Sequence, residues 1–215
     1  MPKQYANFDF ELTLLRDRYD YIIAIDEVGR GAIAGPVVVG ATVVNIDNQA
    51  GIPEGLRDSK LIPEKQRDDY HDKVLGWVLA GSVGSVEASY IDSYGITHSL
   101  AQAAQQAIFK LESAVPDIKE KRTIVLLDGS HNWLKELNLP YFTITKVKAD
   151  LECASVSGAS VLAKVFRDNL MVEASLELED KYGWKSNKGY GAKTHYDAIS
   201  EFGLVDNWHR KTWIK

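Results

Sequence analysis

The sequence predicts an α/β fold in which a mixed β-sheet carries helices on its faces and a helical lobe follows at the C-terminal end. Two observations support this prediction. Short apolar runs rich in β-branched residues come first and then alternate with segments of helical periodicity, whereas the pattern after residue 152 is helical. The 215 residues are 45% hydrophobic and 26% charged, which is typical of a globular protein with one large domain.

Five segments have the length and the composition of strands. The runs at 21–25, 37–44 and 123–127 are almost wholly apolar, as expected for strands that are buried on both faces. The segments at 82–88 and 140–145 contain more polar residues and predict two further strands.

Helical spacing of apolar residues predicts four helices. Pro63 suits the first turn of a helix that includes residues 70–78, and a second helix includes residues 100–111. A long helix is expected from about 152 to 180, and a short one from 195 to 202.

Composition excludes several classes of protein. No apolar stretch approaches the roughly 18 residues that a membrane-spanning helix needs, and the polar N-terminus lacks the apolar core of a signal peptide. We therefore expect an intracellular, cytoplasmic protein with no membrane partner. Cys153 is the only cysteine, which excludes an intramolecular disulfide and a thiol-rich zinc site, and its apolar surroundings predict a buried thiol.

The net charge of −5 argues against a nonspecific nucleic-acid coat, but the charge is unevenly distributed. Residues 181–215 hold seven Lys or Arg against three acids, with six Tyr and Trp residues between them. Such a stretch can bind a phosphate backbone and stack on sugars or bases. A solvated surface whose aromatic residues dock inward explains the same pattern.

Two of the buried strands end in acids. Asp26 and Glu27 follow the run 21–25, and Asp128 follows the run 123–127. If these strands are neighbours, Asp26 and Asp128 lie side by side at the sheet edge where ligands bind. Clustered carboxylates need a cation, and hard oxygen ligands select Mg²⁺ or Mn²⁺, two of which can promote phosphodiester cleavage. The alternative for Asp128 is a turn residue before glycine.

The residues near these acids suit a phosphate ester. Gly29-Arg30-Gly31 combines a backbone that a ligand can approach closely with a guanidinium group that suits phosphate. Ser59 and Lys60 offer a hydroxyl and a cation for a phosphate contact, or they are helix-entry residues ahead of Pro63. Asp150 is a third acid for the site, or the N-cap of the long helix.

In their order along the chain, these motifs resemble those of the ribonuclease HII family. The resemblance extends from about residue 20 to residue 213, and no single motif carries it. The motifs are Asp26-Glu27-Val28-Gly29-Arg30-Gly31, Asp58-Ser59-Lys60, Leu127-Asp128-Gly129, Lys148-Ala149-Asp150, Ala159-Ser160-Val161-Leu162-Ala163-Lys164-Val165 with Arg167-Asp168, Gly189-Tyr190-Gly191 with His195, and His209-Arg210.

The resemblance implies a ribonuclease H-like fold, with a catalytic domain over residues 1–180 and a C-terminal helical lobe over 181–215. The lobe would contribute to nucleic-acid binding within one continuous structural unit. The implied activity is that of a type 2 ribonuclease H, which cleaves the RNA strand of RNA–DNA hybrids and the 5′ side of ribonucleotides embedded in duplex DNA. The products would carry a 3′-hydroxyl and a 5′-phosphate, and a monomer is expected.

The resemblance also implies the residues of the site. Four carboxylates would act in catalysis and bind two Mn²⁺ or Mg²⁺ ions: Asp26, Glu27, Asp128 and Asp150. The backbone of Gly29-Arg30-Gly31 would recognise the ribose 2′-hydroxyl and the adjacent phosphate, and Tyr190 would pack on the neighbouring sugar. Ser59 and Lys60 complete the implied substrate-binding set.

Some positions keep two interpretations. Ala192 departs from the family, which often has Thr after Gly-Tyr-Gly. Glu152 lies two residues beyond Asp150 and competes with it as a metal ligand. A structural role is favoured for Arg167. Four other residues fit either contact with nucleic acid or a structural role: Lys164, His195, His209 and Arg210.

Other functions are less consistent with these motifs. A catalytically silent hybrid-binding module would have no use for four carboxylates that face phosphate. A different nuclease of the same fold, such as a junction resolvase, would not need Gly-Arg-Gly together with Tyr190 to sense a ribose. Ribonuclease HIII normally carries an N-terminal extension domain and tends to lack the Arg, whereas only about twenty residues precede the first strand here.

Overall fold

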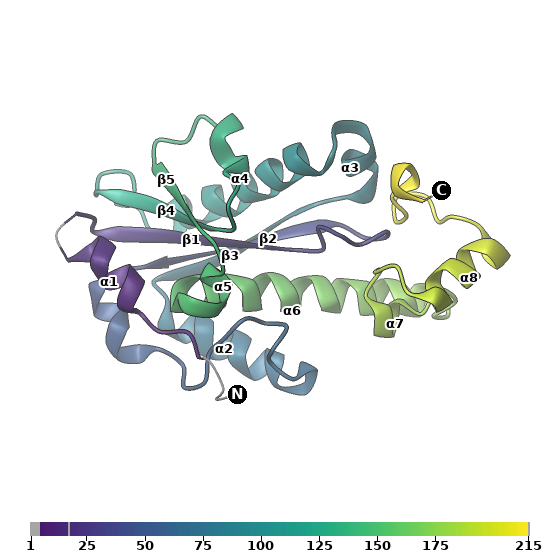
Figure 1. Ribbon diagram of the computed structural model, residues 1–215, viewed down its shortest axis with the longest axis horizontal. Helices are drawn as coiled ribbons and strands as arrows, with labels where there is room; N and C mark the ends of the chain where they lie inside the picture. Colours follow the sequence, from purple (N-terminus) through teal and green to yellow (C-terminus); the bar gives the residue numbers. More distant parts are fainter. Residues whose placement is uncertain (1–4, 17, 215) are drawn as a thin grey trace.

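A five-stranded mixed sheet forms the centre of the molecule in the computed structural model, which describes residues 5–16 and 18–214 (Figure 1). The order across the sheet is β3-β2-β1-β4-β5. Strand β1 pairs antiparallel with β2 and parallel with β4, β2 pairs antiparallel with β3, and β4 pairs parallel with β5. The strands are β1 (Tyr21–Val28), β2 (Val37–Val44), β3 (Ala80–Val86), β4 (Thr123–Asp128) and β5 (Phe142–Lys146).

Helices lie on both faces of this sheet, as the sequence predicts. Helix α4 packs on β2 and β3 from one side, and α6 packs on β1 and β2 from the other. Helix α2 lies outside α6. The helices are α1 (Asp9–Leu15), α2 (Arg67–Trp77), α3 (Ala88–Tyr94), α4 (Ile96–Ala114), α5 (Ala149–Glu152), α6 (Ala154–Glu177), α7 (Trp184–Asn187) and α8 (Lys193–Phe202).

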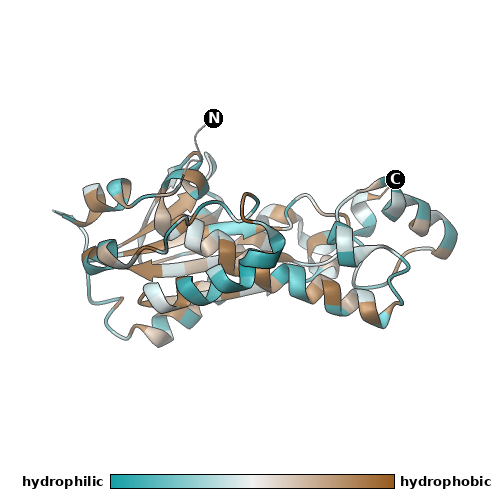
Figure 2. Ribbon diagram, turned by 90° about the horizontal axis from the view of Figure 1, so that it is seen from below, coloured by the Kyte–Doolittle hydropathy of each residue, from teal (hydrophilic) through white to brown (hydrophobic). Residues whose placement is uncertain are grey.

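The apolar run in β1 serves both faces because successive side chains of a strand point in opposite directions. Ile22 and Ala24 belong to the core beneath α6, whereas Ile23 and Ile25 belong to the core beneath α4. Burial on both faces explains why the strand lacks alternation of polar and apolar residues. Figure 2 shows the same contrast, with strands that are largely hydrophobic and helices along which hydrophobic and hydrophilic residues alternate.

The C-terminal lobe packs against the end of α6 that lies away from α5, at the right of Figure 1. Its core combines Met171 of α6 with Tyr182 and Trp184. Tyr182 and Trp184 dock inward, as one of the two interpretations of the C-terminal aromatic residues predicts, whereas Tyr190 is 37% exposed. Contact of the lobe with nucleic acid stays a prediction.

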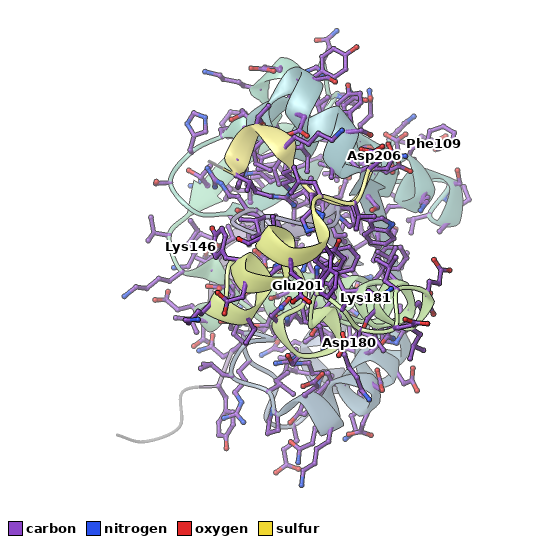
Figure 3. All side chains as sticks on the ribbon, turned by 90° about the vertical axis from the view of Figure 1, so that its right-hand side faces the viewer. Phe109, Lys146, Asp180, Lys181, Glu201 and Asp206 are labelled. Carbon is purple, nitrogen blue, oxygen red and sulfur yellow. The ribbon has the colours of Figure 1, made fainter. Side chains whose placement is uncertain are left out.

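The outer surface of the lobe is charged. Figure 3 looks at the molecule from the lobe side and shows Asp180, Lys181 and Glu201 there, all of them exposed. Because α6 supplies part of the lobe core, the lobe and the sheet domain share one helix. The domain boundary at residue 180 stays a prediction.

The predicted strands all occur, but β1 is longer than its apolar run. It continues to Val28, so Asp26 and Glu27 are strand residues and do not follow the strand. Helices α1, α3 and α7 have seven residues or fewer, and such short segments show too few turns for a periodic pattern to emerge. Within residues 5–16 and 18–214, no helix is long and apolar enough to cross a membrane.

The helix predicted over 152–180 is interrupted at its start. Cys153 has an extended backbone (φ −100°, ψ 121°), which separates α5 from α6, and α6 ends at Glu177. Lys148, in the left-handed region, is the N-cap of α5, so the interpretation of Asp150 as an N-cap is wrong. The Cys153 thiol is buried, as predicted.

Helix α6 approaches β2 so closely that position 40 must be glycine. A Cβ atom at Gly40 would overlap the carbonyl oxygen of Ala159 in α6. This contact fixes the depth at which α6 lies on the sheet, and with it the position of the neighbouring Ser160.

We expect Gly40→Ala to lower the free energy of unfolding by about 1–3 kcal/mol, because the added methyl group pushes α6 away from the sheet. Urea or thermal unfolding measures this change. Gly76→Ala is the matched control, since no atom in the described part of the chain lies within 4 Å of a Cβ placed there. Gly76 lies in α2, so alanine should be neutral or stabilising by up to about 1 kcal/mol. Equal effects of the two substitutions would contradict the close contact.

Candidate active site

The predicted acids meet at one edge of the sheet. Ile25 pairs with Leu127 in the parallel register of β1 and β4, so the next residues, Asp26 and Asp128, are neighbours. Asp150, in α5, lies beside them, because its backbone N–H donates to Asp128 Oδ1 at 3.2 Å. The neighbouring positions expected for Asp26 and Asp128 are therefore confirmed.

Burial and like charge disfavour the ionised form of these acids. Burial raises the pKa of Asp26 well above its usual range, Glu27 and Asp128 add to the rise, and a hydrogen bond from Ser160 opposes it. Burial also raises the pKa of Glu27, against the opposing charge of Arg30, whose Nη1 lies 3.3 Å from Glu27 Oε1. Among the described residues, Asp26 Oδ2 is a buried oxygen without a hydrogen-bond partner.

The same effects act on the third acid. Burial and the charge of Asp128 raise the pKa of Asp150 to about 6. Within the described ranges, no three or more His, Cys, Asp or Glu side chains are already arranged to hold a metal ion. The carboxylates of the cluster have few positive charges near them. A divalent cation bound between them would neutralise their negative charge.

Lys60 brings positive charge to this cluster. Its Nζ lies 3.9 Å from both Asp58 Oδ1 and Asp150 Oδ2. Burial lowers the pKa of Lys60, but the surrounding carboxylates outweigh that effect and raise it. Ser59 is fully buried, and its Oγ lies 2.9 Å from Ser160 Oγ. Its side chain therefore packs behind the acids and is not exposed to a phosphate in solvent.

The loop after β1 needs its two glycines for different reasons. Gly29 has φ +85°, and a Cβ atom there would overlap the side chain of Arg167 and the carbonyl oxygen of Pro36. Gly31 is exposed, and within the described structure no atom lies within 4 Å of a Cβ placed on it. The fold therefore requires glycine at position 29, whereas position 31 leaves backbone open to a ligand.

This loop borders a cavity of about 400 Å³, and Glu27 is the member of the acid cluster that lines it. Tyr190, from the lobe, faces the same cavity, and the Arg167 guanidinium lies over its ring at 5.3 Å from the centroid. The structure thus brings together most of the predicted substrate-binding residues. The cavity is lined by Glu27, Val28, Gly29, Arg30, Gly31, Lys60, Lys164 and Tyr190.

Two fully buried arginines hold the loop from beneath. Arg210 donates to the carbonyl oxygens of Gly29, Arg30 and Gly35 at 2.7–3.2 Å. Arg167 donates to three further carbonyls, those of Ala34, Pro36 and Lys188. Both guanidinium groups bind backbone carbonyls, so Arg167 has a structural role through backbone carbonyls and not through an ion pair with the acids, and Arg210 has a similar role.

The two ambiguous histidines also have structural roles. His209 Nδ1 accepts from the backbone N–H of Val205, so its Nε2 carries the proton that it donates to His195 Nε2 at 3.1 Å. His195 in turn donates from Nδ1 to the carbonyl oxygen of Tyr190 at 2.9 Å. Burial keeps both rings neutral and lowers the pKa of His209 to about 4. This chain of bonds fixes the backbone of Tyr190.

The positions of Glu152 and Lys164 bear on the two interpretations left open for each residue. Glu152 pairs with Lys146, whereas Asp150 lies beside Asp128, and this location favours Asp150 as the third acid of the site. Lys164 pairs with Asp168 at 2.7 Å and also borders the cavity, and its contact with phosphate stays a prediction.

Sequence reasoning did not single out Asp58 and Ser160 as parts of the site. Asp58 accepts from the backbone N–H of Lys60, and Ser160 donates toward Asp26 from the buried face of α6. Both lie inside motifs that the resemblance covers, but a motif does not show which side chain supports which acid.

Comparison of the sequence with known proteins identifies a family. The family model for ribonuclease HII matches residues 23–215. The chain belongs to the ribonuclease HII family. The ribonuclease HII of Streptomyces avermitilis is 38% identical over 192 residues, which cover 89% of this chain and 76% of that protein. The chain is accordingly a type 2 ribonuclease H, as the motifs imply.

Solved structures share the fold. The ribonuclease HII of Archaeoglobus fulgidus, solved in a complex with PCNA, aligns with a TM-score of 0.71 at 21% identity over 89% of this chain and 94% of that one. Bst-RNase HIII in complex with Mn²⁺ aligns with a TM-score of 0.68 at 20% identity over 91% of this chain and 68% of that one. The ribonuclease H-like fold is therefore confirmed.

The two loop glycines offer a paired test of the site. We expect Gly31→Ala to melt within about 1 °C of the unchanged protein, because the methyl group meets open space, but to lower kcat/KM on an RNA–DNA hybrid about 10-fold or more. Gly29→Ala should cost about 1–3 kcal/mol or more of stability, since alanine there is strained and overlaps Arg167. Thermal melts and cleavage rates measure both. Full activity of Gly31→Ala would contradict the assignment of this backbone to substrate.

Proposed function

We propose that the enzyme hydrolyses the RNA strand of RNA–DNA hybrids and the phosphodiester on the 5′ side of a ribonucleotide embedded in duplex DNA, leaving a 3′-hydroxyl and a 5′-phosphate. One observation supports this most strongly. Glu27, which belongs to the carboxylate cluster, and the exposed Gly31 backbone border a single cavity. The group that senses the sugar is thereby next to the groups that act on its phosphate.

We assign two divalent cations, Mn²⁺ or Mg²⁺, to Asp26, Glu27, Asp128 and Asp150. The donor set fits hard cations, and the buried, unpartnered Asp26 Oδ2 fits a metal bond in place of a hydrogen bond. When bound, such ions activate a water and stabilise the leaving oxygen. The relative solved with Mn²⁺ supports this assignment.

Recognition of the ribose falls to the loop backbone. Arg210 binds the carbonyls of Gly29 and Arg30, which leaves the amide side of the loop for the 2′-hydroxyl and the adjacent phosphate. Tyr190 has one face against Arg167 and would pack its other surface on the neighbouring sugar. Arg30, Lys60 and Lys164 would neutralise phosphates. Ser59 would act through Ser160 without touching substrate.

The central experiment compares an end-labelled duplex that contains one ribonucleotide with an all-DNA control, in Mn²⁺ and in Mg²⁺. We expect cleavage of the first duplex only. Asp26→Asn should lower the rate at least about 10³-fold while substrate binding persists. Glu152→Gln, an acid two residues from Asp150 but outside the cluster, should stay within about twofold. Binding without cleavage in either metal would favour a silent hybrid-binding module, and equal cleavage of both duplexes would favour a different nuclease.

Stability in the absence of metal should depend on pH in a defined direction. The raised pKa values of Asp26, Glu27 and Asp150 mean that the folded state binds protons more readily than the unfolded state. Their contribution to stability is present near pH 4 and is lost as the pH rises through about 6. A divalent ion should restore it, so the Mn²⁺-induced rise in Tm should be greater at pH 7.5 than at pH 5.

At a Mn²⁺ concentration of about 100 times Kd, the rise at pH 7.5 should be about 5–10 °C. The buried histidines change stability with pH in both the presence and the absence of metal, so the difference between the two melts isolates the carboxylates. Asp26→Asn supplies the control, since it removes a buried charge and should reduce the Mn²⁺ effect. A rise of equal size at both pH values would contradict the proposed ligand set.

A further inference from the structure

The segment before β1 is bonded to the junction between α5 and α6. The backbone N–H of Asn7 donates to the carbonyl of Glu152 at 3.1 Å, and the N–H of Ala154 donates to the carbonyl of Asn7 at 2.8 Å. Phe8 and Leu12 anchor the same segment in the core beneath α6. The family match begins at residue 23, so Asn7, Phe8 and Leu12 lie outside it, whereas Glu152 and Ala154 lie within it.

Glu11 makes the decisive contact of this segment. Its carboxylate is fully buried, and Oε1 accepts from the backbone N–H of Ser155 at 2.9 Å and from Ser155 Oγ at 2.7 Å. Ser155 lies in the first turn of α6, where backbone N–H groups lack partners within the helix. Cys153, the N-cap residue of α6, makes no capping bond with its side chain, as far as the described residues show. A carboxylate from α1 therefore caps α6 and suits the positive end of its dipole.

The junction matters because α5 cannot hold Asp150 in place unaided. Helix α5 has four residues, follows Lys148 in the left-handed region (φ 60°), and ends at the extended Cys153. So short a helix has only the backbone bonds of a single turn, from the N–H of Glu152 to the carbonyl of Lys148 and from the N–H of Cys153 to the carbonyl of Ala149. Its position depends on outside contacts, which include the bond from Ser157 Oγ to the carbonyl of Asp150 at 2.6 Å. Ser157 and Ser155 share the α6 turn that Glu11 caps.

We propose that Glu11 is a positioning residue for the active site, which acts through Ser155 and the start of α6 to set the place of the Asp150 carboxylate. The proposal rests on the assignment of Asp150 as a metal ligand. Removal of the Glu11 acceptor should loosen the α6 terminus and widen the spacing between Asp150 and Asp128. The expected consequence is weaker metal binding with little change in substrate binding.

The test measures Mn²⁺ binding by calorimetry, without substrate, for the full chain and for Glu11→Leu and Glu11→Gln. Glu11→Leu should weaken Mn²⁺ binding about 10-fold, as loss of a supporting contact typically does. Glu11→Gln keeps an oxygen that can accept from Ser155 and should stay within about threefold. Thr13→Ala, an exposed position on the same helix, should leave Mn²⁺ binding unchanged.

Kinetics, measured over a range of Mn²⁺ concentrations up to saturation, add a second readout. Glu11→Leu should keep the KM for the ribonucleotide-containing duplex within twofold, while the Mn²⁺ concentration for half-maximal cleavage rises about 10-fold. If Glu11→Leu does not fold, Ser155→Ala replaces it, because it removes one of the two bonds and should weaken Mn²⁺ binding about threefold.

Unchanged Mn²⁺ affinity in the folded variant, with only a lower Tm, would overturn the proposal and leave Glu11 as a stabilising residue. Failure of the unchanged protein to cleave any duplex would instead overturn the proposed function, and the calorimetric comparison would still decide the role of Glu11.

Discussion

Parallel pairing of β1 with β4 places Asp26 beside Asp128 at a mostly buried edge of the sheet, where burial and like charge disfavour ionised carboxylates. The surrounding structure offsets part of this cost. Ser160 on α6 lowers the pKa of Asp26, and Lys60 lies 3.9 Å from Asp150. The remaining negative charge of the acids is best compensated by bound cations. The close contact of α6 with β2 is therefore a requirement of the site as well as of the core.

Two buried arginines hold the loop after β1 in its conformation. Arg210 and Arg167 are separated from the loop by more than a hundred residues in sequence, yet both donate to carbonyls in or beside it. Together with the histidine pair that fixes the backbone of Tyr190, they make the C-terminal lobe a support for substrate recognition. A loop built on glycine is flexible by composition, and these bonds restrict it before any ligand arrives.

Much of the sheet and the identity of the acids could be predicted from the sequence, because strands buried on both faces leave continuous apolar runs and acids at their ends are conspicuous. The break at Cys153 and the left-handed Lys148 could not, since these conformations depend on tertiary contacts and not on residue type. The bonds of Arg210 also lack a signature in the sequence, because backbone carbonyls look alike at every position. Glu11 escaped notice for a similar reason: its partner is 144 residues away.

We propose that one site senses the ribose and cuts the adjacent phosphate, so the position of the cut tests this coupling most directly. A duplex with one ribonucleotide, labelled at its 5′ end and resolved at single-nucleotide length, shows where the strand breaks. We predict a single product that ends in a 3′-hydroxyl, immediately 5′ to the ribonucleotide. Cuts on its 3′ side, or cuts spread over the flanking DNA, would contradict the coupling of recognition to cleavage.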